Sequence, residues 1–412
     1  MNEKTILLIG TYDTKDAEMR FLERCIREQG AKVLTMDVSV LGDPTEPTNI
    51  SKHDVATAAG MSIDEVIALG DENKAFRAMS QGAAAVVAKS HQEGRIDAML
   101  ATGGTMGTDL ALDCAQALPL GVPKYIVSTV SFSPLIPPDR FAADVQMILW
   151  AGGLYGLNSI CKSSLRQAAG AVTGAAGMAL PPGRSKPLIG MTSLGSSCLR
   201  YMKTLTPALE DRGFEVAVFH STGMGGMAFE KLAADGAFAC VMDFCMQEFG
   251  NMLAGSLVTS GDDRLTNAGK NGTPQMVAPG ALDLIDFAGW EDVPAEYSDR
   301  PFHEHNRLIK SSVFTADERR AWIRAMAERL KTATGPTEFF LPLGGVEEWD
   351  REGQETHDPE GLAALIDEAR KVIPSACSMT EVDGHINDAA FSESVLAVFD
   401  SWVASGKVQA ST

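Results

Sequence analysis

The chain has 412 residues, of which 45% are hydrophobic and 22% charged, so it is a folded globular protein long enough for two domains. Its net charge of −19 excludes the basic surface that nucleic-acid binding requires. It shows no apolar stretch that could span a bilayer, no signal peptide and no CxxC pair among its seven cysteines. We therefore expect a cytoplasmic protein with reduced thiols and with neither membrane nor nucleic-acid partners.

The first predicted unit is a buried strand, a turn and a helix. The apolar run 4–9 suits a parallel strand, Gly10 ends it, and apolar residues then recur at helical spacing. A helix N-terminus attracts anions, and hydroxyl and ammonium groups strengthen this attraction. The candidate phosphate ligands are Gly10, Thr11, Asp13, Thr14 and Lys15, and Asp13 could also cap the helix or hold Mg²⁺. The same residues fit a tight turn with an ordinary N-cap, since their spacing is neither Walker nor GxGxxG.

Two later strand ends resemble the first in composition. The segment 30–38 is predicted to be a helix stop followed by a second strand that ends in Asp37, a position that often meets a ribose hydroxyl in nucleotide-binding units. The strand 98–101 leads into a turn rich in glycine and threonine, and the strand 124–130 also ends in hydroxyls. The candidate nucleotide ligands of the glycine turn are Thr102, Gly103, Gly104, Thr105, Gly107 and Thr108. These strand ends are expected to form a ligand crevice at the carboxyl edge of a doubly wound sheet. The alternative for the glycine turn is a tight turn beside a packed helix, without a ligand.

A domain boundary is expected at Pro181-Pro182-Gly183, which breaks a stretch rich in alanine and glycine. The segment 186–220 then repeats the order strand, glycine, helix, strand of the chain's beginning. The sequence therefore predicts an α/β fold of two Rossmann-like doubly wound subdomains facing a cleft, residues 1–183 and 184–412. The last helix, 389–403, is expected to pack back across the first subdomain.

The second half carries polar residues beyond what packing requires. Histidines follow predicted strands or lie in loops, and acidic residues accompany one of them near the C-terminus. A histidine beside an aspartate suits general acid/base chemistry, and such residues can also ligate metal, although no zinc spacing is present. The candidate catalytic residues are His385, Asp388, Asp383, His305 and His220. Surface or helix-capping roles are the alternative for each.

Several long motifs, taken together, resemble one known family. They are GTYDTK, ATGGTMGT, FHSTGMGGMAFEKL, TSGDDRLTNAGKNGTPQMVAPGALD, LPLGGVEEWD and DGHIND, in this order along nearly the whole chain. This set resembles the tomato mosaic virus resistance protein family and its ATP-binding domain. The resemblance implies two Rossmann-like subdomains, a bound adenine nucleotide and a homodimer. It assigns nucleotide binding to Gly10, Thr11, Asp13, Thr14 and Lys15 and to the turn from Thr102 through Thr108.

Three functions are compatible with these features. The first is an ATP-using enzyme, similar to a phosphotransferase or ligase, acting with Mg²⁺ on a small polar or carboxylate metabolite in the interdomain cleft. The second is a nucleotide-gated binding or regulatory protein that closes around ATP without chemistry. The third is a metal-dependent lyase or hydrolase in which second-half histidines and Asp383 hold the ion.

Overall fold

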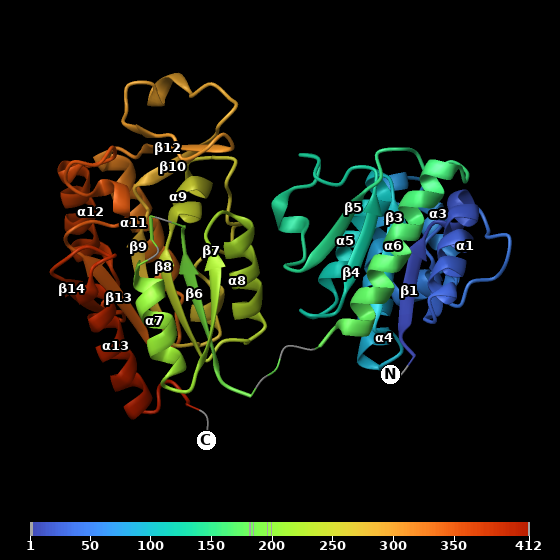
Figure 1. Cartoon of the computed structure of the whole chain (residues 1–412), viewed down its shortest axis with the longest axis horizontal. Coiled ribbons are helices and arrows are strands. Elements are labelled where there is room, and N and C mark those ends of the chain that lie inside the picture. Colours follow the sequence, from blue (N-terminus) through green and yellow to red (C-terminus); the bar gives the residue numbers. More distant parts are fainter. Residues whose placement is uncertain (1–2, 181–182, 184, 196, 199, 411–412) are drawn as a thin grey trace. The chain divides into compact units, whose positions relative to one another are not determined.

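The computed structural model describes residues 3–180, 183, 185–195, 197, 198 and 200–410 (Figure 1). Contacts divide the chain into two compact units, Met1–Gly183 and Arg184–Thr412. The prolines of the expected boundary, Pro181 and Pro182, lie outside the described residues. Each unit contains a parallel sheet with helices on both faces, which confirms the predicted doubly wound α/β class. No helix in the described ranges is long and apolar enough to cross a membrane.

The first unit alternates strands and helices. In chain order its elements are β1 (Thr5–Gly10), α1 (Tyr12–Glu28), β2 (Lys32–Asp37), α2 (Lys52–Ala58), α3 (Ile63–Ala68), α4 (Glu72–Gln92), β3 (Ala98–Gly103), α5 (Thr105–Gln116), β4 (Lys124–Ser128), η1 (Pro138–Arg140), β5 (Val145–Leu149) and α6 (Ser159–Met178). Alternate side chains of β1 enter different cores: Ile6 and Leu8 pack with α1 and α6, whereas Leu7 and Ile9 pack with α2 to α5. Burial on both faces explains the uninterrupted apolar run of this strand.

The strand order of the first sheet creates a switch point. The order is β2-β1-β3-β4-β5, and every neighbouring pair is parallel. The chain runs from β1 outward to β2 and then returns to β3 on the other side of β1. Because α1 and α5 cover opposite faces, the turns after β1 and β3 leave adjacent strand ends in opposite directions. Ligands of doubly wound sheets bind in the crevice that such a divergence opens.

The second unit repeats this plan with more elements. They are β6 (Leu188–Ser193), α7 (Arg200–Glu210), β7 (Glu215–His220), α8 (Met224–Ala234), β8 (Cys240–Cys245), α9 (Gln247–Leu253), α10 (Asn267–Lys270), β9 (Gln275–Gly280), β10 (Leu284–Ala288), η2 (Ala295–Tyr297), β11 (Phe302–His303), β12 (Ile309–Val313), α11 (Ala316–Leu330), β13 (Thr337–Pro342), η3 (Glu348–Asp350), α12 (Pro359–Val372), β14 (Ser378–Val382) and α13 (Ala389–Ala404). The parallel sheet has the order β14-β13-β9-β8-β6-β7, with a switch point between β6 and β8. The last helix, α13, packs beside α7 on one face of this sheet.

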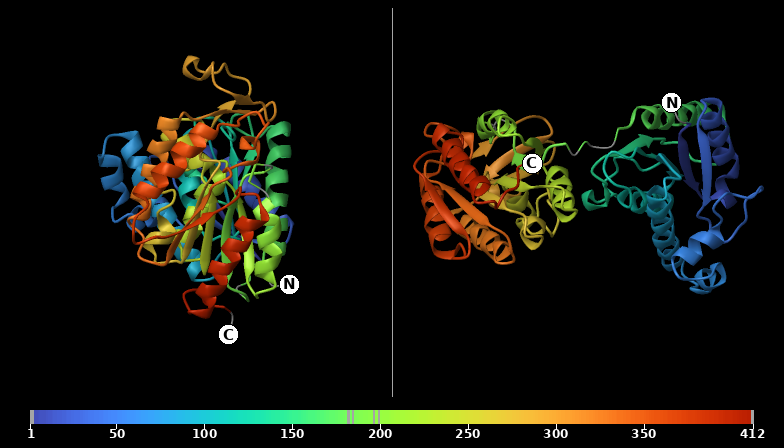
Figure 2. Two further views of the ribbon diagram at one scale, coloured as in Figure 1. Left: turned by 90° about the vertical axis from the view of Figure 1, so that its left-hand side faces the viewer. Right: turned by 90° about the horizontal axis from the view of Figure 1, so that it is seen from below.

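A small antiparallel sheet interrupts the second unit. Its order is β10-β12-β11, and Figures 1 and 2 show its connecting chain extending beyond the carboxyl ends of the parallel strands. Buried Asp286 on β10 anchors it: Oδ1 accepts from Gln247 Nε2 at 2.8 Å and Ser311 Oγ at 2.6 Å, and Oδ2 accepts from Asn251 Nδ2 at 2.7 Å. These bonds tie the insertion to α9.

Candidate functional site

The amino end of α5 presents unused backbone donors at the first switch point. Its N-cap, Gly104, supplies no side-chain cap, and the amides of Thr105, Met106 and Gly107 donate no hydrogen bond to any described residue. A Cβ built on Gly104 would meet Thr129 Oγ1 at 3.8 Å, an ordinary contact. Free N–H groups at the positive end of a helix attract an anion. This end of α5 can therefore receive a phosphate.

The turn after β1 has largely used its backbone donors. Tyr12 N donates to Asp37 Oδ1 at 3.2 Å, and Asp13 N donates to Ser39 Oγ at 3.1 Å. Asp37 is buried, and the same Oδ1 also accepts from Ser39 N at 3.0 Å. The Asp37 carboxylate at the end of β2 thus binds a backbone amide at the start of α1. This is a structural role, whereas its position had suggested a contact with a ribose.

Side chains, rather than amides, remain available at this first turn. Lys15 breaks the helical backbone with φ −129°, and its Nζ lies 3.3 Å from Thr11 Oγ1 and 3.2 Å from Thr14 Oγ1. One ammonium and two hydroxyls therefore gather at the edge of the crevice. The Asp13 carboxylate turns away toward a loop: its Oδ2 accepts from Gly42 N at 3.3 Å and its Oδ1 is buried. As placed, Asp13 presents no oxygen to a Mg²⁺ ion.

Other predicted nucleotide ligands are packed inside the turns. A Cβ on Gly10 would lie 2.5 Å from Met19 Sδ, and one on Gly103 would lie 2.5 Å from Gly107 Cα. Position 103 needs glycine because the contact is with backbone, whereas a side chain at position 10 would have to displace the flexible Met19 side chain. The remaining two are buried threonines: Thr102 Oγ1 contacts Met19 Sδ at 3.2 Å, and Thr108 Oγ1 shares a hydrogen bond with Ser128 Oγ at 2.6 Å.

The predicted acid/base residue His385 is a fully bonded core residue. Its ring is 1% exposed, and Nδ1 accepts from Asn387 N at 3.0 Å, which assigns the proton to Nε2. Nε2 lies 2.7 Å from Glu347 O and 3.0 Å from Asp350 Oδ1. Asp388 accepts from His385 N at 3.0 Å and pairs with an arginine. In this arrangement the histidine ties together the loops after β13 and β14.

The other three predicted catalytic residues form no hydrogen bond with His385 in the described part of the chain, although Asp383 lies only two residues before it. His220 ends β7 and Asp383 follows β14, which are opposite edges of the sheet, about 24 Å apart at a strand spacing of about 4.8 Å. Both side chains are exposed, and so is His305, whose ring centroid lies 5.7 Å from that of Trp349. In the described part of the chain no three or more His, Cys, Asp or Glu side chains are arranged to hold a metal.

The glycine turn before α8 already holds a carboxylate of the protein. Glu248 Oε2 accepts from Gly223 N at 2.7 Å and Gly226 N at 3.3 Å, while its Oε1 accepts from Arg264 Nε at 2.8 Å. Arg264 is 0% exposed and also pairs with Asp243 and Glu230. Burial raises the pKa of Glu230 to about 7 and raises that of Glu248 as well. This network fills the anion-binding turn of the second unit.

A second carboxylate cluster follows β9 and β13, and one member lacks partners. Asp283 is 0% exposed, and neither carboxyl oxygen bonds to any described residue. Burial raises its pKa to about 7, opposed by the attraction of Arg319. Burial and the Asp283 charge raise the pKa of nearby Glu347, which accepts from Thr356 Oγ1 at 2.8 Å. Perturbed carboxyl groups at a carboxyl sheet edge are typical of functional sites.

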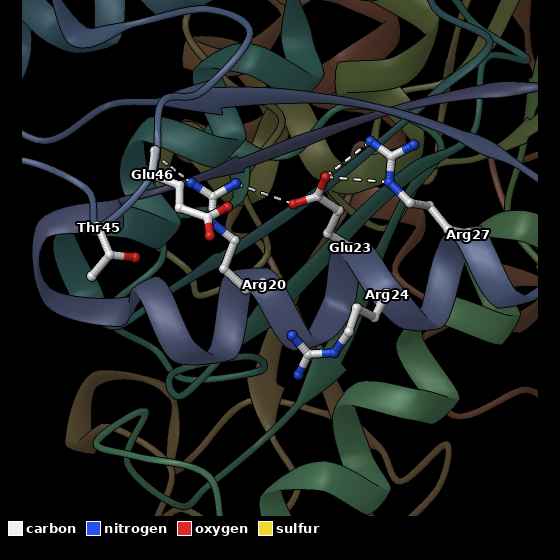
Figure 3. A pocket seen from close by; sticks show the side chains of 6 residues that line it. All are labelled: Arg20, Glu23, Arg24, Arg27, Thr45 and Glu46. Carbon is white, nitrogen blue, oxygen red and sulfur yellow. Dashed lines mark hydrogen bonds and ion pairs between the residues drawn. The ribbon is translucent and has the colours of Figure 1, made fainter.

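The first unit has a surface groove along α1. Figure 3 shows its lining, which is Arg20, Glu23, Arg24, Arg27, Thr45 and Glu46, around a volume of about 290 Å³. Glu23 pairs with Arg20 at 3.2 Å and with Arg27 at 2.9 Å. Much of the positive charge is thus neutralised within the groove, and no residue predicted to bind nucleotide lines it.

The family models and the sequence relatives agree on one family. Models of the Uncharacterised protein family (UPF0261) match residues 4–181 with its N-terminal domain and residues 186–403 with its C-terminal domain. A protein of this family from Brucella melitensis is 52% identical over 407 residues, which cover 99% of this chain and 97% of that protein. Among solved structures, the S. aureus MnaA–UDP complex aligns with a TM-score of only 0.21 at 10% identity, over 67% of this chain and 79% of that one, which carries no functional meaning.

The resemblance drawn from the motifs is confirmed by a plant relative. The ToMV resistance protein Tm-1(GCR237) of Solanum lycopersicum is 26% identical over 425 residues, covering 97% of this chain and 56% of the longer plant protein. Both halves of the chain and nearly its full length are therefore accounted for, and the chain belongs to the UPF0261 family.

Proposed function

We propose that the first unit binds the phosphates of an adenine nucleotide between the turns after β1 and β3. The observation that carries this proposal is the uncapped amino end of α5 at the same switch point as Lys15 and its two threonine hydroxyls. Backbone donors and one ammonium supply the charge-assisted hydrogen bonds that a polyphosphate needs, even in a chain of net charge −19. The adenine part rests on the resemblance to the virus resistance protein family.

Calorimetric titration of the full chain with ATP tests the proposal. Lys15→Ala removes a charge-assisted bond and should weaken binding about 10- to 150-fold. Gly104→Val places a side chain in the space before the α5 amides and should abolish binding. Lys162→Ala, at an exposed position of α6, and Gly174→Val, where a Cβ meets no atom within 4 Å, are the matched controls. Wild-type affinity in both test variants would refute a phosphate site here.

A second candidate function is chemistry on a small polar or carboxylate metabolite in the second unit, of phosphotransferase or ligase type. Asp283 favours it, because a buried carboxyl without partners costs stability that a bound ligand would restore. Incubation with ATP, Mg²⁺ and a panel of hydroxy and carboxylic acids should release phosphate or AMP with one of them, and Asp283→Asn should abolish that release. Binding of ATP without turnover of any acid would favour the nucleotide-gated regulatory protein instead.

The resemblance also supports a homodimer. Light scattering of the purified chain should then give twice the chain mass, and a monomer at all concentrations would refute this part of the proposal.

A further inference from the structure

Phe132 combines two unfavourable features in the first unit. Its side chain is 76% exposed, and its backbone has φ +63°, in the left-handed region. It occupies the third position of a turn that Ser133 N closes by donating to Val130 O at 3.1 Å. That position favours glycine, and a bulky side chain there raises the free energy of the backbone. Neither burial nor backbone preference explains a phenylalanine at this site.

The loop that carries Phe132 begins at the wall of the proposed phosphate site. It follows β4, the neighbour of β3, and Thr129 N donates to Gly103 O at 3.2 Å. Thr129 Oγ1 is also the atom nearest to the absent Cβ of Gly104. Ser131 is buried and its Oγ donates to Ser128 O at 3.4 Å, which anchors the loop next to the exposed ring. Phe132 is thus held three residues from the site, on an anchored turn.

We propose that Phe132 is the platform on which the nucleotide base stacks, an inference that rests on the phosphate site proposed above. A nucleotide with its phosphates at α5 has its base several ångströms away along the carboxyl edge, and an exposed aromatic ring is the side chain that binds a base by its face. Strain held at a fixed, exposed position is common at ligand clamps. Since stacking accepts any base with a π-face, the site should discriminate weakly between adenine and guanine nucleotides.

The test compares ATP with inorganic tripolyphosphate, which has the phosphates but no base, on the full-length protein. Phe132→Ala should weaken ATP binding about 5- to 150-fold, the range for loss of one stacked base, and leave tripolyphosphate binding unchanged. Phe132→Trp should retain ATP affinity. Phe132→Gly should weaken ATP binding equally while raising the melting temperature, because glycine relieves the positive φ. Leu135→Ala, at a 72% exposed aliphatic side chain of the same loop, is the matched control and should bind ATP normally.

The outcomes separate the two proposals. If wild-type protein binds tripolyphosphate and ATP, and Phe132→Ala binds both as tightly as wild type, the stacking role is refuted and the phosphate site stands. Equal losses of ATP and tripolyphosphate affinity in Phe132→Ala would also refute stacking, because they would show a general distortion of the loop. If wild-type protein binds neither ligand, both proposals fall together.

Discussion

Replacing Asp283 with asparagine should stabilise the second unit, and the gain should depend on pH. The wild-type carboxyl is fully buried and its two oxygens have no partner among the described residues, so the amide sacrifices no hydrogen bond. The substitution instead replaces a carboxyl group that can ionise with an amide that cannot. In the folded chain burial raises the pKa of Asp283 from 3.8 to about 7, whereas the unfolded chain keeps the lower value.

The direction in which pH changes the free energy of unfolding follows from proton linkage. Below pH 4 the carboxyl of Asp283 is protonated in both the folded and the unfolded state, so its titration does not change the free energy of unfolding. Between pH 4 and pH 7 the unfolded chain loses the proton while the folded chain retains it, so rising pH lowers the free energy of unfolding by about 1.4 kcal/mol per pH unit. Above pH 7 the penalty is constant, at most about 4 kcal/mol for a shift of this size. Asp283→Asn should therefore gain about 3 kcal/mol more at pH 8 than at pH 5.

Urea unfolding at pH 5 and pH 8, followed by tryptophan fluorescence, measures this difference. The second unit contains four of the five tryptophans, at positions 290, 322, 349 and 402, so the signal reports mainly on it. Asp286→Asn is the comparison, because Asp286 is also buried but has donors on both oxygens, and losing these bonds should cost about 1–3 kcal/mol. Burial raises the pKa of Asp286 only to about 6, so the effect of its replacement should change less between pH 5 and pH 8 than that of Asp283→Asn. A destabilised Asp283→Asn protein, or a gain that is equal at both pH values, would refute the reasoning.

Two further substitutions test the buried networks of the second unit. Arg264→Met leaves Asp243 and Glu248 as buried carboxylates without their counter-ion, and urea unfolding should show a loss of about 3–5 kcal/mol; Arg264→Lys, which keeps the charge, should lose less. His385→Ala leaves the Asn387 amide unpaired and opens a cavity, so the same assay should show a loss of about 2–4 kcal/mol, whereas an unchanged midpoint would show that the ring has no structural role.

The parallel sheets could be predicted because burial on two faces leaves a direct mark on the sequence. Strands β1, β3, β6 and β13 lie between two helical layers, and each has an apolar run that supplies side chains to cores on both faces. The antiparallel sheet of residues 284–313 has no comparable apolar pattern in the sequence. Its strands are short, β11 has two residues, and its position depends on Asp286 meeting side chains 35 and 39 residues earlier on α9. Such contacts join distant segments and have no local pattern.

The second-half residues were predicted from chemical type, and strand order decides whether such residues meet. His220 ends a strand and His385 follows one, which in a parallel sheet brings both to the same edge, yet β7 and β14 lie at opposite ends of that edge. The buried network around Arg264 was not predicted. Arg264 stands in a polar stretch, and its partners Glu230 and Asp243 lie 34 and 21 residues earlier in the chain, so no local pattern marks the cluster.

Three turns in this chain have nearly the same composition of glycine and hydroxyl residues, and they differ in what fills them. At α1 the amides of Tyr12 and Asp13 are taken by Asp37 and Ser39, side chains from the next strand end.

At α8 the glycine amides bind Glu248, which buried Arg264 holds in place. At α5 no described side chain occupies the amides, and Gly104 leaves the space before them clear of close contacts. An anion-binding turn is completed either by a carboxylate of the protein or by a ligand, because free amides at a helix end favour a negative charge in both cases. The composition of a turn therefore identifies where an anion can bind, and the side chains brought by other elements determine which of these places remains open for a ligand.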